Sequence, residues 1–186
     1  MSTSHPPASL PLQLHYTVRA CALGQVLVAA TPNGIAAVLL GDDKSALIDD
    51  LQQRYPLAEL GTGGPVLHRW SDTVLEILAH PSLQHIVPLD VQGGTEFQRK
   101  VWKALRSIPP GQTRSYGQVA KHLEQPQAVR AVASACAANP LAVLVPCHRV
   151  LRSDGGLGGY RWGLQRKQLL LELEGLRRKA DHRRNL

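Results

Sequence analysis

Cysteine is scarce in this sequence, and the few cysteines stand far apart. The three thiols are Cys21, Cys136 and Cys147. An odd number of cysteines at wide spacing is unlike the framework of a disulfide-stabilised secreted domain, and unlike the close cysteine pairs that hold a structural metal. The sequence therefore excludes a disulfide framework and predicts no metal site.

Long hydrophobic runs are also missing from the 186 residues. No uninterrupted apolar stretch approaches the roughly 20 residues that a membrane-spanning helix needs. Residues 1–12 contain Pro and Ser but no basic start followed by an apolar block, so we expect no secretory signal. These absences exclude a membrane protein and predict a cytoplasmic location. The length suits one good-sized domain or two small ones.

Acidic residues are few in the second half of the chain. Residues 1–92 carry four Lys or Arg and eight Asp or Glu, a balance of −4. Residues 93–186 carry seventeen Lys or Arg and six Asp or Glu, a balance of +11. This asymmetry is typical of a chain in which one half binds a polyanion such as nucleic acid. The alternative is a basic tail at residues 176–186, which we expect to be disordered, but an excess of cations remains without it.

The first half of the chain has the pattern of a small α/β domain. Residues 13–40 are strand-prone, and Thr31-Pro32-Asn33-Gly34 is a turn signal, so an antiparallel hairpin is predicted. Apolar residues at helical spacing predict a helix over residues 66–79. Residues 80–94 contain two prolines and two glycines and are interpreted as a connector, or as a strand with loops. We place a domain boundary near Gly93, which gives an N-terminal domain of residues 1–92 with a structural or regulatory role.

The second half is predicted to be mainly helical. Thr95 is placed to cap a helix with one apolar face, which Pro109-Pro110-Gly111 stops. Short helices are predicted over residues 116–123 and 127–138, separated by the turn Glu124-Gln125-Pro126. Two short helices joined by a tight turn suggest a helix-turn-helix, although many helical hairpins bind no nucleic acid.

The second of these short helices has a surface of small residues. Val129, Val132 and Cys136 share one face by their spacing, and we expect them to be buried. The opposite face offers Arg130, surrounded by small residues. Such a face permits close approach to a surface, either DNA backbone or another packed helix.

A candidate nucleophile follows the apolar residues 141–145, which we expect to form a buried strand ending in Pro146-Cys147-His148-Arg149-Val150. Neighbouring side chains on a strand point to opposite faces, so contact between Cys147 and His148 requires a turn at Pro146. With that contact His148 would draw off the thiol proton; without it Cys147 is a structural thiol.

Two further segments near the C-terminus bear on this thiol. Residues 153–163 form a glycine-rich loop, either part of a ligand pocket or a plain connector. A last helix over residues 164–174 is predicted to end at Gly175. Glu172 and Glu174 lie in its final turn, where the helix dipole disfavours acids by about 0.3–1 kcal/mol. The unfavourable position of one of these acids would be compensated if its carboxylate oriented a histidine. The alternative is that the acid is solvated on the surface.

Together these segments resemble the O6-alkylguanine-DNA alkyltransferase family, also called methylated-DNA–protein-cysteine methyltransferases. The resemblance covers residues 95–175 and is close to the C-terminal domain of the bacterial adaptive-response alkyltransferases. The segments that fit in order are residues 97–108, 115–116, 128–139, the Pro-Cys-His-Arg-Val motif at 146–150, and residues 158–167. The N-terminal half fits the small, ribonuclease H-like α/β domain of the family only loosely. The fold class implied is α/β, with a mainly helical C-terminal domain at residues 93–175 that contains a winged-helix-like helix-turn-helix.

The resemblance assigns catalytic roles to five residues. Cys147 is the acceptor thiol, His148 is its base through a bridging water, and Glu174 orients His148. Asn139 is a hinge that ties the recognition helix to the segment holding the cysteine. Tyr116 crowds the 3′ phosphate and hydrogen-bonds the guanine.

The resemblance also implies a DNA-binding face and a substrate pocket. Arg130 is a finger that fills the space left by a flipped nucleotide, and Ala131, Ser134 and Ala137 share its helix. The backbone carbonyls of Cys147 and Val150 would read the exocyclic amine of guanine. The turn that closes over O6 consists of Gly158, Gly159, Tyr160 and Arg161.

The implied function is direct DNA repair without a cofactor. Double-stranded DNA is bound through its minor groove, the alkylated nucleotide is flipped out, and the alkyl group moves irreversibly to Cys147. Each molecule then acts once, as a monomer located at the nucleoid. Activity on O4-alkylthymine and cooperative assembly on DNA are left open by the sequence.

Two departures from the family pattern stand out. Arg161 replaces a serine, and Ala142 replaces a proline found in some members. Some members also bind zinc in the N-terminal domain through two Cys and two His, but only Cys21 is available in that half, so no such zinc is expected.

Three other functions compete with alkyl transfer. An alkyltransferase-like damage sensor would carry tryptophan in place of Cys147. A helix-turn-helix transcription factor would need readers of base edges that the Ala-rich helix lacks. A thiol hydrolase or redox enzyme would need substrate-binding features that are absent from the rest of the chain.

Overall fold

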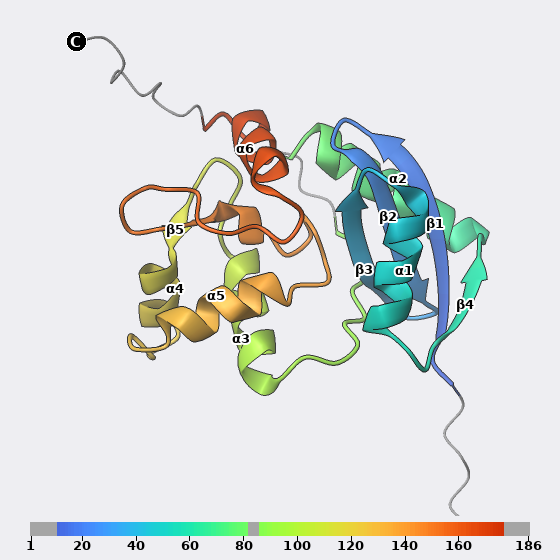
Figure 1. Ribbon diagram of the computed structural model, residues 1–186, viewed down its shortest axis with the longest axis horizontal. Helices are drawn as coiled ribbons and strands as arrows, with labels where there is room; N and C mark the ends of the chain where they lie inside the picture. The colour runs from blue at the N-terminus through green and yellow to red at the C-terminus, as the bar shows by residue number, and fades with distance from the viewer. Residues whose placement is uncertain (1–10, 82–85, 177–186) are drawn as a thin grey trace, which may run out of the picture.

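The computed structural model describes residues 11–81 and 86–176. A four-stranded sheet with two helices occupies one side of the molecule, and a mainly helical lobe occupies the other (Figure 1). The fold is therefore mixed α/β. The basic tail predicted at residues 176–186 lies, except for Leu176, outside the described residues. Within those residues no helix is long and apolar enough to cross a membrane.

The sheet has the strand order β3-β2-β1-β4. The pairs β1–β2 and β2–β3 are antiparallel, whereas β4 runs parallel to β1. The predicted hairpin is confirmed, because β2 and β3 pair around the turn at Pro32 and Asn33. The strands are β1 (Gln13–Cys21), β2 (Gly24–Thr31), β3 (Gly34–Gly41) and β4 (Glu59–Thr62).

Helices α1 (Lys44–Arg54) and α2 (Pro65–Ala79) cover opposite faces of this sheet (Figure 1). Nearly every residue of β2 and β3 is buried as a result, which explains their continuous apolar sequence. The prediction of α2 is confirmed. Helix α1 was not predicted from the sequence; Asp43 caps it by accepting a hydrogen bond from the Ala46 N–H at 2.8 Å.

The helical lobe contains α3, the α4–α5 pair and α6, as the sequence predicted. Helices α3 and α4 each begin with a capping box, in which the side chains of Thr95 and Ser115 accept from the third backbone N–H. The elements are α3 (Glu96–Arg106), β5 (Arg114–Ser115), α4 (Tyr116–His122), α5 (Val129–Ala137), the short 3-10 helix η1 (Cys147–Arg149), β6 (Val150–Leu151) and α6 (Leu164–Leu173).

The buried strand predicted over residues 141–145 is wrong. The chain turns there, with Val143 at a φ of 60°, and Cys147 begins the 3-10 helix η1 instead of ending a strand. The side-chain amide of Asn139 explains the turn, because it donates to the carbonyls of Leu141 and Val145. Residues 141–145 are strand-prone, but they form little sheet pairing because the Asn139 side chain binds two of their carbonyls.

The edge of β3 joins the two lobes through backbone hydrogen bonds. The Val38 N–H donates to the Pro140 carbonyl at 2.8 Å, and the Ala142 N–H donates to the Val38 carbonyl at 2.9 Å. The connector near Leu89 forms a similar bridge to Ile35 on the same edge. One continuous apolar core includes residues from both lobes. The sheet thus supports the segment that leads into Cys147.

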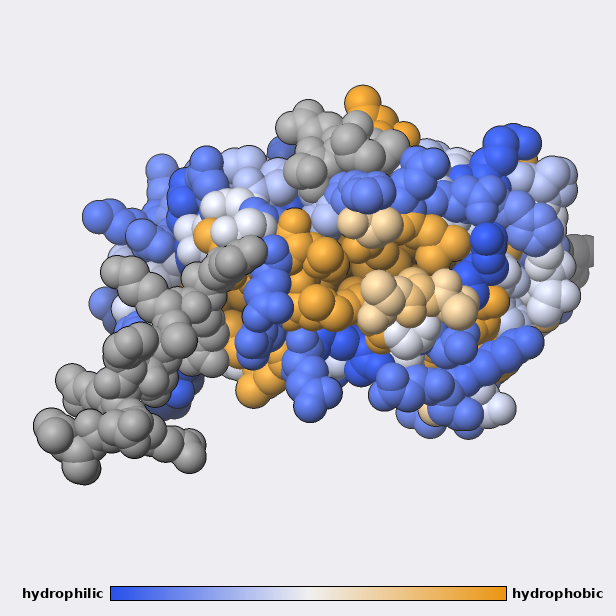
Figure 2. Space-filling view, turned by 90° about the horizontal axis from the view of Figure 1, so that it is seen from above, coloured by the Kyte–Doolittle hydropathy of each residue, from blue (hydrophilic) through white to orange (hydrophobic). Residues whose placement is uncertain are grey.

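The surface seen from above in Figure 2 shows an apolar area bordered by hydrophilic residues. Over the whole surface of the described residues, the exposed large apolar side chains are Leu57, Val66, Ile86, Val129, Leu164, Leu169 and Leu173. More than half of a folded protein's surface is apolar on average, so we attach no site to this area.

Candidate active site

Asn139 lies directly after α5 and organises the cysteine segment. Its side chain is fully buried. The Nδ2 atom is 2.8 Å from the Val145 carbonyl and 3.2 Å from Sγ of Cys147, and Oδ1 accepts from the Leu141 N–H at 2.9 Å. One buried amide therefore connects the end of the second short helix with the thiol.

Cys147 is almost completely buried, with 4% of its surface exposed. Burial raises the pKa of its thiol to about 11, although the hydrogen bond from Asn139 and the nearby Lys167 charge act in the opposite direction. The thiol is consequently protonated at neutral pH. Its activation as a nucleophile requires a base that takes the proton during the reaction.

His148 follows Cys147 in η1 and is hydrogen-bonded to Glu174. The distance between His148 Nε2 and Glu174 Oε1 is 2.8 Å, and both side chains are buried. Burial lowers the pKa of His148, against the opposing effect of Glu174. The imidazole is therefore neutral at pH 7. Because an ionised carboxylate can only accept, Nε2 carries the proton and Nδ1 is left with a free lone pair.

Glu174 is held as a buried anion by donors from two other segments of the chain. Burial by itself would raise the pKa of Glu174, but hydrogen bonds from His148 and Arg149 together lower it to about 2. The Arg149 guanidinium donates to both carboxylate oxygens, and the Gly111 N–H donates to Oε2 at 3.2 Å. Arg149 also donates to the carbonyl of Ile108. This role of Arg149 was not predicted from the sequence; its place in the Pro-Cys-His-Arg-Val motif was the available signal.

A cavity of about 320 Å³ opens beside Cys147. One wall comes from α5 and the opposite wall from the glycine-rich loop before α6. The ring of Tyr160 packs edge-on to His148, with ring centres 6.5 Å apart. The lining residues are Tyr116, Ala133, Cys136, Ala137, Cys147, Gly159, Tyr160 and Arg161.

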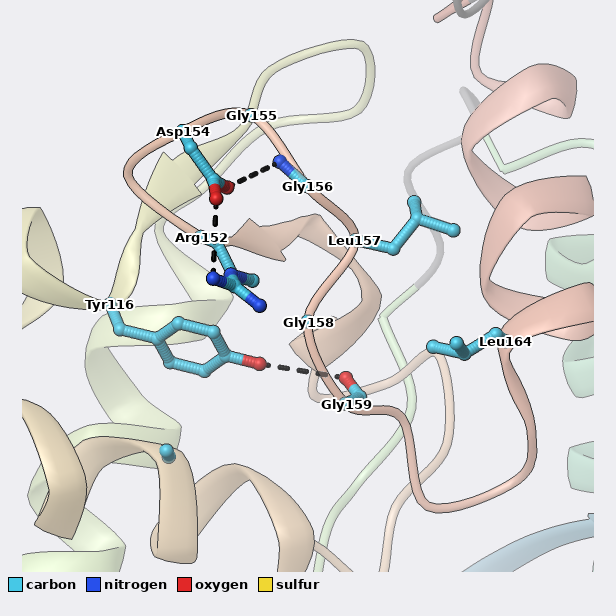
Figure 3. A pocket seen from close by; sticks show the side chains of 10 residues that line it. Tyr116, Arg152, Asp154, Gly155, Gly156, Leu157, Gly158, Gly159 and Leu164 are labelled. Atoms are coloured by element: carbon cyan, nitrogen blue, oxygen red, sulfur yellow. Dashed lines mark hydrogen bonds and ion pairs between the residues drawn. The ribbon is translucent and has the colours of Figure 1, made fainter.

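A larger cavity of about 900 Å³ adjoins the first and shares Tyr116, Ala133 and Gly159 with it. In Figure 3 the Tyr116 side chain extends toward the loop, with its hydroxyl 3.5 Å from the Gly159 carbonyl. Gly158 faces this ring at a φ of +65°, and a Cβ atom there would lie 3.0 Å from the Tyr116 ring. The loop can approach Tyr116 this closely only because position 158 is glycine.

Lys167 of α6 holds the same loop from inside the protein. Its ammonium group is buried and donates to the carbonyls of Val150, Leu157 and Gly159. Burial lowers the pKa of Lys167 to about 8. The Val150 carbonyl, which the resemblance places against guanine, is 2.6 Å from this ammonium. Lys167 lies in residues 158–167, which resemble the family, but no role was predicted for it from the sequence.

The exposed face of α5 consists of small residues around one arginine. Arg130, Ala131, Ser134 and Ala137 are all exposed, whereas Val132 and Cys136 are buried as predicted. The expected burial of Val129 is wrong, because 39% of its surface is exposed. Val129 is the first residue of α5, and at this end of the helix the rest of the helical lobe does not cover its side chain.

The structure brings the predicted catalytic residues together around the smaller cavity and its hydrogen-bond network. Glu172, the alternative acid of the last turn, lies on the surface and pairs with Gln168. No cluster of three or more potential metal ligands occurs in residues 11–81 and 86–176.

Comparison with known proteins places these features in a family. Residues 96–176 match the model of the 6-O-methylguanine DNA methyltransferase DNA-binding domain. The bifunctional transcriptional activator and DNA repair enzyme Ada of Escherichia coli is 48% identical over 163 residues, which cover 88% of this chain and 46% of Ada. A methylated-DNA–protein-cysteine methyltransferase of Mycobacterium tuberculosis is 54% identical over 95 residues, covering 51% of this chain and 57% of that protein. The chain thus spans about half the length of the curated relatives that it matches.

Solved structures agree over nearly the whole chain. The crystal structure of Mycobacterium tuberculosis O6-methylguanine methyltransferase superposes with a TM-score of 0.71 at 34% identity, covering 90% of this chain and 96% of that one. The same organism's OGT in complex with DNA has a TM-score of 0.68 at 33% identity, covering 88% and 92%. On this similarity of sequence and structure, the chain belongs to the O6-methylguanine-DNA methyltransferase family.

Proposed function

We propose that this chain repairs DNA by moving the alkyl group from O6 of guanine irreversibly to Sγ of Cys147. The observation that carries the proposal is the chain of contacts around that thiol. Cys147 lines a cavity, the next residue is a neutral histidine, and that histidine is 2.8 Å from a buried carboxylate. Membership of the methyltransferase family, and the DNA complex of a relative, support the same reaction.

The DNA-binding role is supported by α4 and α5. The small exposed residues of α5 would let this helix enter the minor groove, where Arg130 fills the space left by the flipped nucleotide. Extrusion of a nucleotide costs a few kcal/mol, which the Arg130 contact offsets in part. Tyr116, at the start of α4 and beside the cavity, crowds the 3′ phosphate.

The chemistry follows from the protonation states. Nδ1 of His148 takes the Cys147 proton through a bridging water, and Glu174 stabilises the imidazolium through Nε2–H. The thiolate sulfur attacks the alkyl carbon in line, forming the S–C bond while the C–O6 bond breaks. Tyr116 donates one proton to guanine, which leaves as a neutral base, and the proton held by His148 returns through water to the Tyr116 oxygen. The net change is that the thiol proton of Cys147 ends on guanine. The product thioether has no group in the cavity that would hydrolyse it, so each molecule acts once.

The finer architecture belongs to the same proposal. We assign residues 1–92 to a ribonuclease H-like structural domain and residues 93–175 to a DNA-binding and alkyl-acceptor domain with a winged-helix-like unit. The protein acts as a cytoplasmic monomer on double-stranded DNA and uses no cofactor. The backbone carbonyls of Cys147 and Val150, with the turn at residues 158–161, read the flipped base.

Mass spectrometry tests the function directly. The protein is incubated with duplex DNA containing one O6-methylguanine, and its peptides are then mapped. We expect a gain of one methylene on the peptide that holds Cys147, with an equal loss of methyl from the DNA and no second turnover. Binding without modification would instead indicate a damage sensor, and repeated turnover would contradict the single-use mechanism.

A further inference from the structure

The side chain of Arg161 leaves the wall of the Cys147 cavity and forms an ion pair with the N-terminal half of the chain. Its Nη2 atom is 2.8 Å from Oδ1 of Asp50, a residue of α1 that lies 111 positions earlier in the sequence. Each of the two side chains is 32% exposed. The contact therefore links the substrate loop to a helix that carries none of the predicted catalytic residues.

The same guanidinium also reaches the opposite wall of the cavity. Nη1 of Arg161 lies 3.5 Å from the carbonyl of Ala137, the last residue of α5, and both residues line the cavity. Arg54, one turn beyond Asp50 on α1, donates to the adjacent Ala138 carbonyl at 3.3 Å. Helix α1 thus fixes both the loop and the end of α5. Cations at a helix C-terminus are also favoured by the helix dipole.

The two ends of the loop are held differently. Near Gly159 the loop is fixed by the buried Lys167, whose ammonium is 3.0 Å from the Gly159 carbonyl. On both sides of position 161 the backbone is fixed, because the rings of Tyr160 and Trp162 pack against each other with centres 5.3 Å apart. The Arg161 side chain itself is held by its contacts with Asp50 and Ala137. A buried ammonium with three carbonyls is a rigid anchor, whereas a partly exposed ion pair contributes little to global stability. Loss of Asp50 should therefore free the Arg161 side chain at the cavity mouth and leave the fold intact.

We propose that Asp50 is a positioning residue that sets the width of the Cys147 cavity through Arg161, and so limits the size of the alkyl group transferred. The inference rests on the proposed function, because it concerns substrate selection at the same thiol. It also gives the N-terminal half a specific part in the reaction.

The test compares two substrates in one DNA sequence. Duplexes that carry O6-methylguanine or O6-benzylguanine at the same position are mixed with excess protein, and the single-turnover rate of transfer is measured for each. Because the flanking DNA is identical, differences in DNA binding cancel in the benzyl-to-methyl ratio. We expect Asp50→Asn to raise this ratio about two- to fivefold, the range for a partly exposed ion pair. Asp50→Glu keeps the charge and should restore the wild-type ratio.

Asp42→Asn is the matched control. Asp42 also belongs to the N-terminal half and forms an ion pair with Arg166, at 2.6 Å, but neither residue lines the cavity. This variant should keep the wild-type ratio.

The outcomes separate the two proposals. Normal methyl transfer with an unchanged ratio in Asp50→Asn would overturn the role of Asp50 alone. An equal change in Asp42→Asn would overturn it as well, because the effect would then be general loosening between the lobes. Absence of methyl transfer by the wild-type protein would contradict the proposed function itself.

Discussion

Glu174 shows how a residue that is unfavourable for its helix becomes useful for the site. An acid at the end of a helix opposes the helix dipole, yet this carboxylate is the cap of α6. Three donors, His148, Arg149 and the Gly111 N–H, compensate for that position. The cost of placing an anion there is thus offset by the same contacts that orient the imidazole.

The stability of the protein should depend on pH through Glu174. Its folded pKa of about 2 lies below the usual value of about 4.3, so its contribution is fully present above pH 4.3 and is lost as pH falls toward 2. A shift of this size corresponds to about 3 kcal/mol. Urea unfolding should therefore show Glu174→Gln to be less stable by about that amount at pH 7, and by about half of it at pH 3.

The neighbouring acid serves as the control for this prediction. Glu172 is exposed and accepts a hydrogen bond from Gln168 on the surface of α6, so Glu172→Gln should change the free energy of unfolding by less than about 0.5 kcal/mol. A pH-independent difference between Glu174→Gln and the wild type would contradict the assigned ionisation. His148 adds to the loss of stability in acid, because its lowered folded pKa means that the unfolded chain binds the proton first as pH falls through about 6.5.

At the scale of elements, two helices with the same start have different relations to the site. Thr95 and Ser115 form equivalent capping boxes, with side chains 3.1 Å from the N–H groups of Gln98 and Gln118. Ser115 precedes Tyr116, which borders both cavities, whereas Thr95 begins α3 away from them. Of the two capping boxes, that of α4 is the one next to a residue that lines the cavities.

Substitution of the two caps separates stability from function. Thr95→Ala and Ser115→Ala should each lower the free energy of unfolding by about 1 kcal/mol. Only Ser115→Ala should also slow alkyl transfer from duplex DNA, because fraying of the first turn of α4 displaces Tyr116. Thermal unfolding and single-turnover rates measure the two effects. Equal slowing by both variants would show that the rate follows stability alone.

At the scale of the whole molecule, the charge is divided between the two lobes. Residues 1–92 carry a balance of −4 and residues 93–186 a balance of +11. The acidic half supplies partners for arginines of the basic half at Asp42 and Asp50. These pairs join the lobes, and the basic half still carries an excess of cations.

The affinity for undamaged duplex DNA should therefore fall steeply with salt. If about four phosphates are neutralised, an increase from 50 to 200 mM salt should weaken binding about 10²-fold. A chain shortened to end at Leu176 still has a balance of +7 in residues 93–176 and should keep most of this dependence. Fluorescence anisotropy at several salt concentrations measures the slope. A flat slope in the shortened chain would locate DNA binding in the tail.

The sequence by itself determined the local features of this protein. Thr95, the turn at Pro32 and Asn33, and the apolar spacing of residues 66–79 act over a few residues, so the corresponding helices and hairpin were predicted. Helix α1 was missed because its apolar pattern is weak and only two of its residues, Leu47 and Leu51, are buried. Cys147 and His148 were singled out as adjacent residues, but adjacency left a structural thiol as the alternative, and the role of His148 as base followed from the family resemblance.

Only the tertiary structure decided how distant groups meet. Residues 141–145 are strand-prone, but the buried amide of Asn139 binds their carbonyls and turns the chain. The roles of Arg149 and Lys167 depend on carbonyls and a carboxylate from other segments, and Asp50 meets Arg161 across 111 positions. Sequence patterns report local periodicity and capping, whereas these contacts arise from packing between segments that no local pattern relates.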